Sequence, residues 1–174
     1  LPILQRRNQS AAESSLAPRA ISEKQQKLLD AFDLYVQYVP DAPELPAIKY
    51  RRAYVYYQFN HFDAAIPLFQ DLAEHHRKSE LAPYAARLLI DSLANKINTA
   101  TENAEKYLAQ LEQQIDRFQS MPELLKDAEF SAELSEKRVS ILRKRIEELE
   151  KQGSYREAGK LNLQLAERFP NNPR

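Results

Sequence analysis

Hydrophobic residues recur along most of the chain at intervals of three and four positions. The first run, which follows Ser22, carries Leu28, Leu29, Phe32 and Val36. This spacing places apolar side chains on one face of an α-helix. Similar runs continue toward the C-terminus, so the pattern predicts about seven helices. Their connections are only a few residues long, which favours antiparallel neighbours.

Capping patterns locate the expected starts of several helices. Ser or Thr followed three positions later by Glu or Gln is typical of a helix N-terminus. Such pairs are Ser22–Gln25, Thr99–Glu102, Ser120–Glu123 and Ser154–Glu157. Pro46 indicates another start, because proline is tolerated in the first turn of a helix. Pro67 falls inside a predicted helix and is expected to loosen or kink it, unless Asp63 caps that helix.

One predicted helix, residues 123–152, is much longer than the others. Neither glycine nor proline interrupts it, and its length at 1.5 Å per residue is about 45 Å. Its apolar seam is Leu125, Ala128, Ala132, Ser135, Val139, Leu142, Ile146 and Leu149. A seam that alternates steps of three and four residues suits a helix lying across a stack of repeats. It also suits a coiled coil that pairs two copies of the chain.

Composition supports an all-α fold. The 174 residues include only two glycines and no cysteine. Tight β-hairpin turns need glycine or Asn-Gly, and the missing cysteines exclude disulfides and thiolate metal sites. Residues 1–20 contain several Ser and Pro residues and are expected to be a flexible linker or tail. Residues 21–174 are expected to form one helical repeat domain.

Charge and motifs argue against several functions. The chain has 25 Lys and Arg and 25 Asp and Glu, so no net charge attracts nucleic acid. Two glycines cannot build a phosphate-binding loop. His75 and His76 are adjacent, diverge by about 100° on a helix, and are interpreted as exposed histidines at a helix end. We therefore predict no enzyme, no metal and no cofactor, and no membrane span, because no apolar run reaches about 18 residues.

Two segments resemble the tetratricopeptide repeat family. In residues 47–76, small and aromatic residues alternate across two helices and the turn at Asn60 and His61. The positions that match the family pattern are Ala53, Tyr56, Phe62, Ala65 and Phe69. In residues 146–170, the matching positions are Gly153, Tyr155 and Ala158, while Asn162 stands where an aromatic residue is usual. A degenerate unit near residues 80–118 contributes Ala104 and Leu108.

The resemblance implies an irregular solenoid of antiparallel helices whose function is to bind proteins. The family pattern assigns packing roles to the matching positions above. It places a peptide or protein partner against Tyr50, Arg51, Tyr54, Tyr57 and Gln58. The alternative is that the helix over residues 22–39 covers these tyrosines. A second alternative for the whole chain is a structural spacer or a self-associating module that pairs through residues 123–152.

The sequence also resembles repeat regions of bacterial cell-envelope proteins. This resemblance rests mainly on the phrase SELAPYAARLLIDSL after a repeat helix. It implies a periplasmic or envelope-associated protein within an assembly or motility complex, with the cytoplasm as the alternative. A homo-oligomer remains open at this point.

Overall fold

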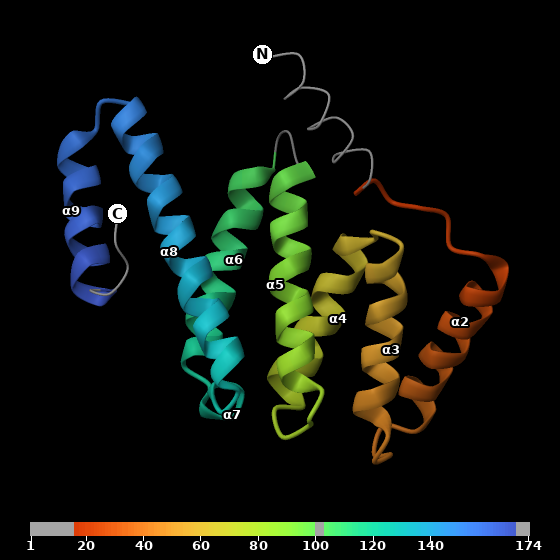
Figure 1. The fold of residues 1–174 in the computed structure, drawn as a ribbon. Helices are drawn as coiled ribbons and strands as arrows, with labels where there is room; N and C mark the ends of the chain where they lie inside the picture. Colours follow the sequence, from red (N-terminus) through yellow and green to blue (C-terminus); the bar gives the residue numbers. More distant parts are fainter. Residues whose placement is uncertain (1–15, 100–102, 170–174) are drawn as a thin grey trace. The chain divides into compact units, whose positions relative to one another are not determined.

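The computed structural model describes residues 16–99 and 103–169, and it is all-α (Figure 1). These residues form eight helices, α2 to α9, and no strand. The prediction of an all-helical chain is therefore confirmed. The chain divides into two compact units, and the boundary falls between Leu124 and Leu125, inside the predicted domain 21–174. Most of the predicted linker, residues 1–15, lies outside the described residues.

The first unit is built from consecutive helices that pack against each other in chain order. They are α2 (Glu23–Tyr38), α3 (Leu45–Gln58), α4 (Phe62–His75), α5 (Ala82–Thr99) and α6 (Ala104–Gln119). Besides these consecutive pairs, α3 also packs against α5. A short helix, α7 (Pro122–Leu125), follows at the boundary between the units. None of the helices in the described ranges has the length and apolar character needed to cross a membrane.

Two predicted helix starts are confirmed. The Ser22 hydroxyl accepts a hydrogen bond from the Gln25 amide at 3.4 Å, and the Gln25 side chain accepts one from the Ser22 amide at 3.3 Å. These two bonds form the capping box that satisfies donors at the start of α2. Pro46 lies in the first turn of α3, where its missing N–H costs nothing.

Two predicted capping boxes are wrong. Thr99 is the last residue of α5, and its hydroxyl donates to the carbonyl of Asn95 at 2.9 Å. Ser120 follows the end of α6 and donates to the carbonyl of Arg117 at 2.6 Å. In a short connection, a hydroxyl can serve the helix before it as well as the helix after it. Glu102, the expected partner of Thr99, lies outside the described residues.

The turn between α3 and α4 ends α3 with a Schellman motif. Asn60 adopts a positive φ of 61°, which asparagine tolerates better than most residues. The amide of His61 donates to the carbonyl of Tyr56, and the amide of Asn60 to that of Tyr57, both at 2.9 Å. The backbone groups at the end of α3 are thus satisfied within the turn.

The segment before α2 lies against this same turn. The Arg19 amide donates to the Phe59 carbonyl at 2.8 Å, and the Arg19 guanidinium lies 5.5 Å from the centre of the Phe59 ring. The Asn60 side chain donates to the carbonyl of Ala17 at 3.0 Å. The described end of the predicted linker therefore makes specific contacts with the first unit.

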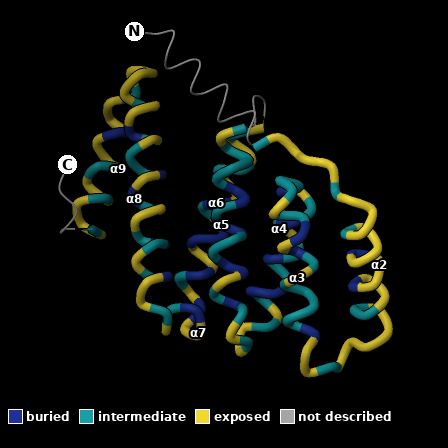
Figure 2. The backbone as a smooth tube through the Cα atoms, turned by 45° about the vertical axis from the view of Figure 1, so that its right-hand side comes forward, coloured by how far each residue is buried: buried dark blue, intermediate teal, exposed yellow. Residues whose placement is uncertain are grey.

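The core of the first unit lies on α4 and α5, where the buried stretches concentrate in Figure 2. Small residues on α5 let its neighbours approach closely, while α4 supplies large side chains. The buried residues of the two helices include Phe62, Ala65, Phe69, Leu72, Ala73, Ala82, Ala85, Ala86 and Leu89. Pro67 lies inside α4, which begins after His61 and not at Asp63, yet the helix continues to His75.

The second unit contains α8 (Ala128–Lys151) and α9 (Tyr155–Arg168), which pack against each other. The prediction of one long helix over residues 123–152 is wrong, because α7 ends at Leu125 and α8 begins at Ala128. The Asp127 carboxylate accepts from the amide of Phe130 at 3.0 Å and so caps α8. The segment is interrupted although it contains no glycine or proline, because Asp127 has the extended backbone of an N-cap, with φ −79° and ψ 100°.

The predicted apolar seam of the long helix is only partly right. The buried residues of α8 are Phe130, Leu134, Val139, Ile141 and Ile146. Val139 and Ile146 belong to the predicted seam, whereas Ala128 and Ala132 are exposed. All predicted seam residues from Ala128 onward lie in α8, and in its first half the helix buries the large side chains of Phe130 and Leu134 in place of the small ones.

Gly153 ends α8, as predicted. It has a positive φ of 77°, which glycine adopts without strain. The Ser154 amide donates to the Leu149 carbonyl at 2.8 Å, and the Gly153 amide to the Glu150 carbonyl at 3.0 Å, which is again a Schellman motif. Ser154 precedes α9, but its side chain makes no capping hydrogen bond. The predicted box with Glu157 is therefore wrong in its hydrogen bonding.

Candidate functional site

Three tyrosines of α3 stack along one face of the helix. The ring centres of Tyr50 and Tyr54 lie 5.9 Å apart with 10° between the ring planes. Those of Tyr54 and Tyr57 lie 6.1 Å apart with 21° between the planes. Positions four and three residues apart are neighbours on a helix surface, which produces this tyrosine ladder (Tyr50, Tyr54 and Tyr57).

The two outer rings of the tyrosine ladder pack against α4. The ring centre of Phe69 lies 6.0 Å from that of Tyr50 and 6.2 Å from that of Tyr57. The Phe62 ring meets Tyr57 edge-on at 5.8 Å. Tyr50 and Tyr57 are consequently half-buried, and burial raises the pKa of the Tyr50 hydroxyl above its ordinary value. The core of the unit thus fixes the ladder in place.

A hydrogen bond ties the ladder to α5. The Tyr57 hydroxyl donates to Oδ2 of Asp91, which also accepts from the Asn95 side chain at 3.2 Å. Burial, and then this hydrogen bond, raise the pKa of Tyr57 far above its ordinary value. Tyr57 therefore stays neutral and remains a hydrogen-bond donor at physiological pH.

The middle of the ladder is open to solvent. Tyr54 is 37% exposed, and its neighbours Arg51 and Gln58 are exposed as well. Tyr84 of α5 is also exposed, and its hydroxyl is close enough to raise the pKa of Tyr50 further. We call the ladder together with Tyr84 the tyrosine face. It combines fixed aromatic rings with accessible surface on two helices.

Helix α2 contacts a different side of α3. Arg52 of α3 forms an ion pair with Asp33 of α2, and Glu44 before α3 accepts from the Tyr35 hydroxyl at 2.7 Å. Arg52 is two positions from Tyr54, which places them about 200° apart around the helix. The alternative that residues 22–39 cover the tyrosines thus fails for Tyr54, which stays exposed.

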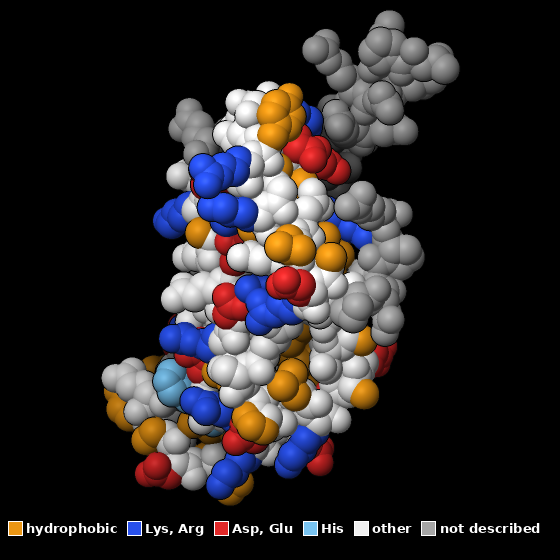
Figure 3. Space-filling model, turned by 90° about the vertical axis from the view of Figure 1, so that its left-hand side faces the viewer, with side chains coloured by type: hydrophobic (Ala, Val, Ile, Leu, Met, Phe, Trp, Pro, Cys, Tyr) orange, Lys and Arg blue, Asp and Glu red, His pale blue; other side chains and the backbone are white. Residues whose placement is uncertain are grey.

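Charges of both signs are mixed on the face of the molecule drawn in Figure 3. Figure 3 shows one face on which acidic and basic side chains intermingle, with hydrophobic side chains scattered between them. This agrees with the balance of 25 basic and 25 acidic residues in the chain. The distinctive feature of the tyrosine face is its aromatic surface.

The positions expected to pack within repeats have mixed environments. Ala53, Phe62, Ala65, Phe69 and Ala158 are buried. Tyr56 is half-buried, with its ring 6.5 Å from that of His61, and Ala104 and Leu108 are also half-buried. On α6 the buried residues are instead Leu111, Gln114, Ile115 and Phe118. Tyr155 is 72% exposed, unlike a packing residue.

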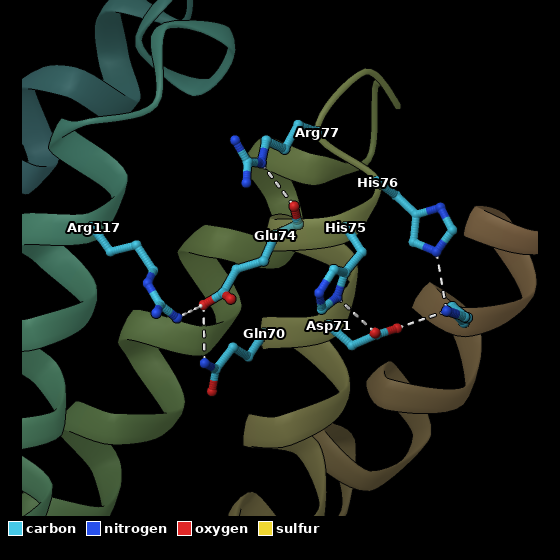
Figure 4. A network of polar contacts seen from close by, with 8 residues as sticks. Gln70, Asp71, Glu74, His75, His76, Arg77 and Arg117 are labelled. Carbon is cyan, nitrogen blue, oxygen red and sulfur yellow. Dashed lines mark hydrogen bonds and ion pairs between the residues drawn. The ribbon is translucent and has the colours of Figure 1, made fainter.

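A polar network surrounds the end of α4 (Figure 4). Lys49 Nζ of α3 donates to Oδ2 of Asp71 at 2.7 Å and lies 3.0 Å from Nε2 of His76. His75 Nδ1 lies 3.0 Å from Oδ1 of Asp71. Burial raises the pKa of Asp71, but its bonds to Lys49 and His75 outweigh burial and hold the pKa below its ordinary value. The network joins α3 to the end of α4.

A second branch of the network joins α4 to α6. Oε1 of Glu74 accepts from Arg117 of α6 at 2.6 Å and from Gln70 at 2.9 Å. Arg77 Nε donates to the backbone carbonyl of Glu74 at 2.7 Å. The carboxylate of Glu74 is therefore occupied by a cation from a neighbouring helix.

An open cavity of about 670 Å³ lies beside this network. Its lining residues are Pro43, Pro46, Glu74, His75, His76, Arg77, Lys78, Ser79 and Glu123. His75 is 70% exposed, as predicted, but the interpretation of His76 as an exposed histidine is wrong, because it is half-buried. Within residues 16–99 and 103–169, no group of three or more His, Asp and Glu side chains could hold a metal ion.

Another network joins three helices at the start of α4. Lys96 Nζ of α5 lies 2.9 Å from Oδ2 of Asp63, and the Tyr107 hydroxyl of α6 donates to Oδ1 at 2.9 Å. The Lys96 ammonium also lies 5.0 Å from the centre of the Tyr107 ring. Burial lowers the pKa of Lys96, but the interactions with Asp63 and Tyr107 together outweigh burial and raise the pKa overall. These bonds hold α4, α5 and α6 together.

Several residues of these sites were not predicted from the sequence. Tyr84 looked like one more apolar position of its helix, and its exposure depends on how α5 packs. Lys49, Asp71 and Asp91 are ordinary charged residues in the sequence, and the Lys49–Asp71 and Tyr57–Asp91 bonds join residues 22 and 34 positions apart. The tetratricopeptide resemblance was the signal that pointed to this face of α3.

The tetratricopeptide resemblance rests on residue pattern alone. Both segments that carry it, residues 47–76 and 146–170, contain a helix pair joined by a Schellman turn, as far as they are described. Comparison of the chain with protein families, with curated proteins and with solved structures finds no match.

Proposed function

We propose that this chain is a non-catalytic scaffold that binds a peptide or a segment of a partner protein on its tyrosine face. The observation that supports this most strongly is the stacked ladder of Tyr50, Tyr54 and Tyr57 with its middle ring exposed. Tyrosine is favoured at interfaces because it offers apolar area together with a polar hydroxyl. Arg51 and Gln58 beside the ladder add a charge and hydrogen-bonding groups.

The fixed position of the ladder favours binding. Tyr50 and Tyr57 pack on Phe69, and Tyr57 is bonded to Asp91. Rings that are already held in place lose little conformational entropy when a partner binds. A partner segment would therefore meet a rigid aromatic surface spanning α3 and α5.

The proposed architecture is an irregular solenoid of antiparallel helices similar to tetratricopeptide repeats. Three features support it: consecutive packing of α2 to α6, the contact of α3 with α5, and the Schellman turns after α3 and α8. In such a stack, every second helix lines the same surface. Tyr84 of α5 would then extend the surface begun by the ladder on α3.

Site-specific crosslinking tests the proposed surface. A photoreactive phenylalanine derivative replaces Tyr54 in one variant and Tyr38 of α2, an exposed control tyrosine, in another. Both variants are irradiated in cells that make the protein naturally. We expect a discrete crosslinked protein with the probe at position 54 and none with the probe at position 38. The same products from both positions, or none from position 54, would contradict the assignment.

Self-association is the second candidate function. Tyr155 and Leu163 of α9 are 72% and 62% exposed, and large apolar side chains at the surface favour association. Pairing through a continuous helix 123–152 is no longer part of this proposal, because that segment contains two helices. Sedimentation of the chain over a hundredfold range of concentration tests it, and a constant monomer mass would reject it.

We further propose, from the resemblance to envelope proteins alone, that the chain acts in the periplasm or at the cell envelope. The alternative is the cytoplasm. Fractionation of cells that carry a tagged copy at the natural locus tests the two locations. Recovery with cytoplasmic markers would reject the envelope proposal without affecting the proposed binding surface.

A further inference from the structure

The turn between α4 and α5 is held to α3 by an unusual contact between two basic side chains. Lys49 Nζ of α3 lies 3.0 Å from Nε2 of His76, the first residue after α4. A lysine ammonium has only donors, so Nε2 of His76 must be the acceptor. This contact therefore requires a neutral His76 that carries its proton on Nδ1.

The surroundings disfavour a charged His76. Burial, and then the nearby Lys49, lower the pKa of His76 below its ordinary value of 6.5, and Asp71 opposes this only in part. Both oxygens of Asp71 are already engaged, Oδ2 by Lys49 and Oδ1 by His75. A protonated His76 would thus direct an N–H at the Lys49 ammonium.

The carboxylates of α4 near His76, Asp71 and Glu74, already accept hydrogen bonds from other cationic side chains. Its charged and titratable surroundings are Lys49 of α3, Asp71, Glu74 and His75 of α4, Arg77 and Lys78 of the turn, and Glu123 of α7. Glu74 is bonded to Arg117. Arg77 and Lys78 add positive charge, and Glu123 of α7 lines the same cavity. Pro43 and Pro46, which also line the cavity, carry no charge.

We propose that Lys49 and His76 form an acid-sensitive latch, which holds the α4–α5 turn against α3 at neutral pH and releases it when His76 is protonated. Two cations at this distance repel each other, so the imidazole must move away from Lys49. His75 and His76 line the open cavity of about 670 Å³ beside the turn, so this movement changes the shape of the cavity. Histidine is the side chain that titrates in this pH range.

The direction of the pH effect follows from the lowered pKa. The unfolded chain, with His76 near its ordinary value of 6.5, binds a proton more readily than the folded chain. The latch therefore stabilises the fold fully above about pH 6.5, and this contribution is lost as the pH falls through the lower pKa of the folded state.

The latch also provides a way to regulate the tyrosine face. Tyr50 follows Lys49 directly in α3, and Tyr84 lies near the start of α5, just after the turn. Release of the turn would change the position of Tyr84 relative to the ladder. This consequence rests on the proposed function, and it predicts weaker partner binding in acid.

Hydrogen exchange of the full chain tests the latch. The variants are His76→Gln, which keeps an acceptor for Lys49 but cannot titrate, and His75→Gln as a control on the same helix. After correction for intrinsic rates, we expect exchange of the amides of residues 76–81 to rise about tenfold between pH 7 and pH 5 in the wild type. The rise should be similar in His75→Gln and below about twofold in His76→Gln.

Two controls make the result decisive. The amide of the buried Leu89 should stay protected at both pH values, which shows that release is local. Nuclear magnetic resonance should show His76 titrating below pH 6.5 in the wild type, and closer to that value in Lys49→Met. Equal exchange in the wild type and His76→Gln, or titration of His76 at or above pH 6.5, would overturn the latch.

Failure of the latch and failure of the proposed function are distinguishable. Exchange and histidine titration involve no partner, so they test the latch alone. Crosslinking from position 54 at pH 7 tests the tyrosine face alone. If a partner crosslinks equally well at pH 7 and pH 5 while the turn is released, the latch stands and its link to binding is wrong.

Discussion

The helix pairs α3/α4 and α8/α9 are joined by the same kind of turn but bury different surfaces. Asn60 in one turn and Gly153 in the other have positive φ angles of 61° and 77°. Each turn closes with a Schellman pair of hydrogen bonds. The second helix of each pair then begins two residues later, at Phe62 or Tyr155.

Equivalent positions after the two turns have different environments. In α4, Phe62, Ala65 and Phe69 are all buried. In α9, Ala158 is buried, but Tyr155 is exposed and Asn162 is only half-buried. α4 packs against both α3 and α5, whereas α9 packs chiefly against α8 in the described chain. The turn is a local property, but the burial of the helix that follows depends on its neighbours.

The largest expected difference between the pairs concerns Phe69 and Asn162. Phe69→Ala removes a fully buried ring and should lower the free energy of unfolding by about 3–5 kcal/mol. Asn162→Ala at the equivalent position should change it by less than about 0.5 kcal/mol. Urea unfolding followed by circular dichroism measures both. Similar losses for the two variants would show that α9 is packed as tightly as α4.

Two glycine substitutions in the second unit test the turn between α8 and α9 separately from the helix that follows it. Gly153→Ala forces a side chain into a positive φ and should destabilise the α8/α9 pair by about 1–2 kcal/mol. Gly159 lies inside α9 with open space around an added methyl group. Gly159→Ala should therefore stabilise the pair by about 0.5–1 kcal/mol. Thermal unfolding measures both effects. A change in stability of the same sign for the two variants would contradict this account.

The hydrogen bond of the ladder should have a smaller effect. Tyr57→Phe removes the hydroxyl that donates to Asp91 and should cost about 1 kcal/mol of stability. Tyr54→Phe removes an exposed hydroxyl of the same helix and should cost almost nothing. Urea unfolding of the two variants compares them. An equal loss would mean that the bond to Asp91 does not hold α3 to α5.

The sequence predicted local features better than those that depend on distant residues. Ser22, Pro46 and Gly153 mark helix ends through their own chemistry, and the structure has them where the pattern indicated. Thr99 and Ser120 match the same capping pattern, but they bond to the helix before them. A hydroxyl near two helix ends has two sets of partners, and the local sequence does not decide between them.

The candidate site was predicted only in part for the same reason. The family resemblance pointed to Arg51, Tyr54 and Gln58 of α3, and the structure leaves these three side chains exposed. The packing of Tyr50 and Tyr57 on Phe69 depends on how α3 crosses α4. The break at Asp127 was also missed, because a helix pattern without glycine and proline does not show where a side chain caps the backbone.

The most direct test of the central claim compares the two helix pairs in binding. The partner identified by crosslinking is titrated against Tyr54→Ala and against Tyr155→Ala, which removes the exposed tyrosine of α9. We expect Tyr54→Ala to weaken binding at least about fivefold, or about 1 kcal/mol, and Tyr155→Ala to leave it unchanged. Unchanged affinity for Tyr54→Ala, with a loss for Tyr155→Ala, would contradict the account and place the binding surface on α9.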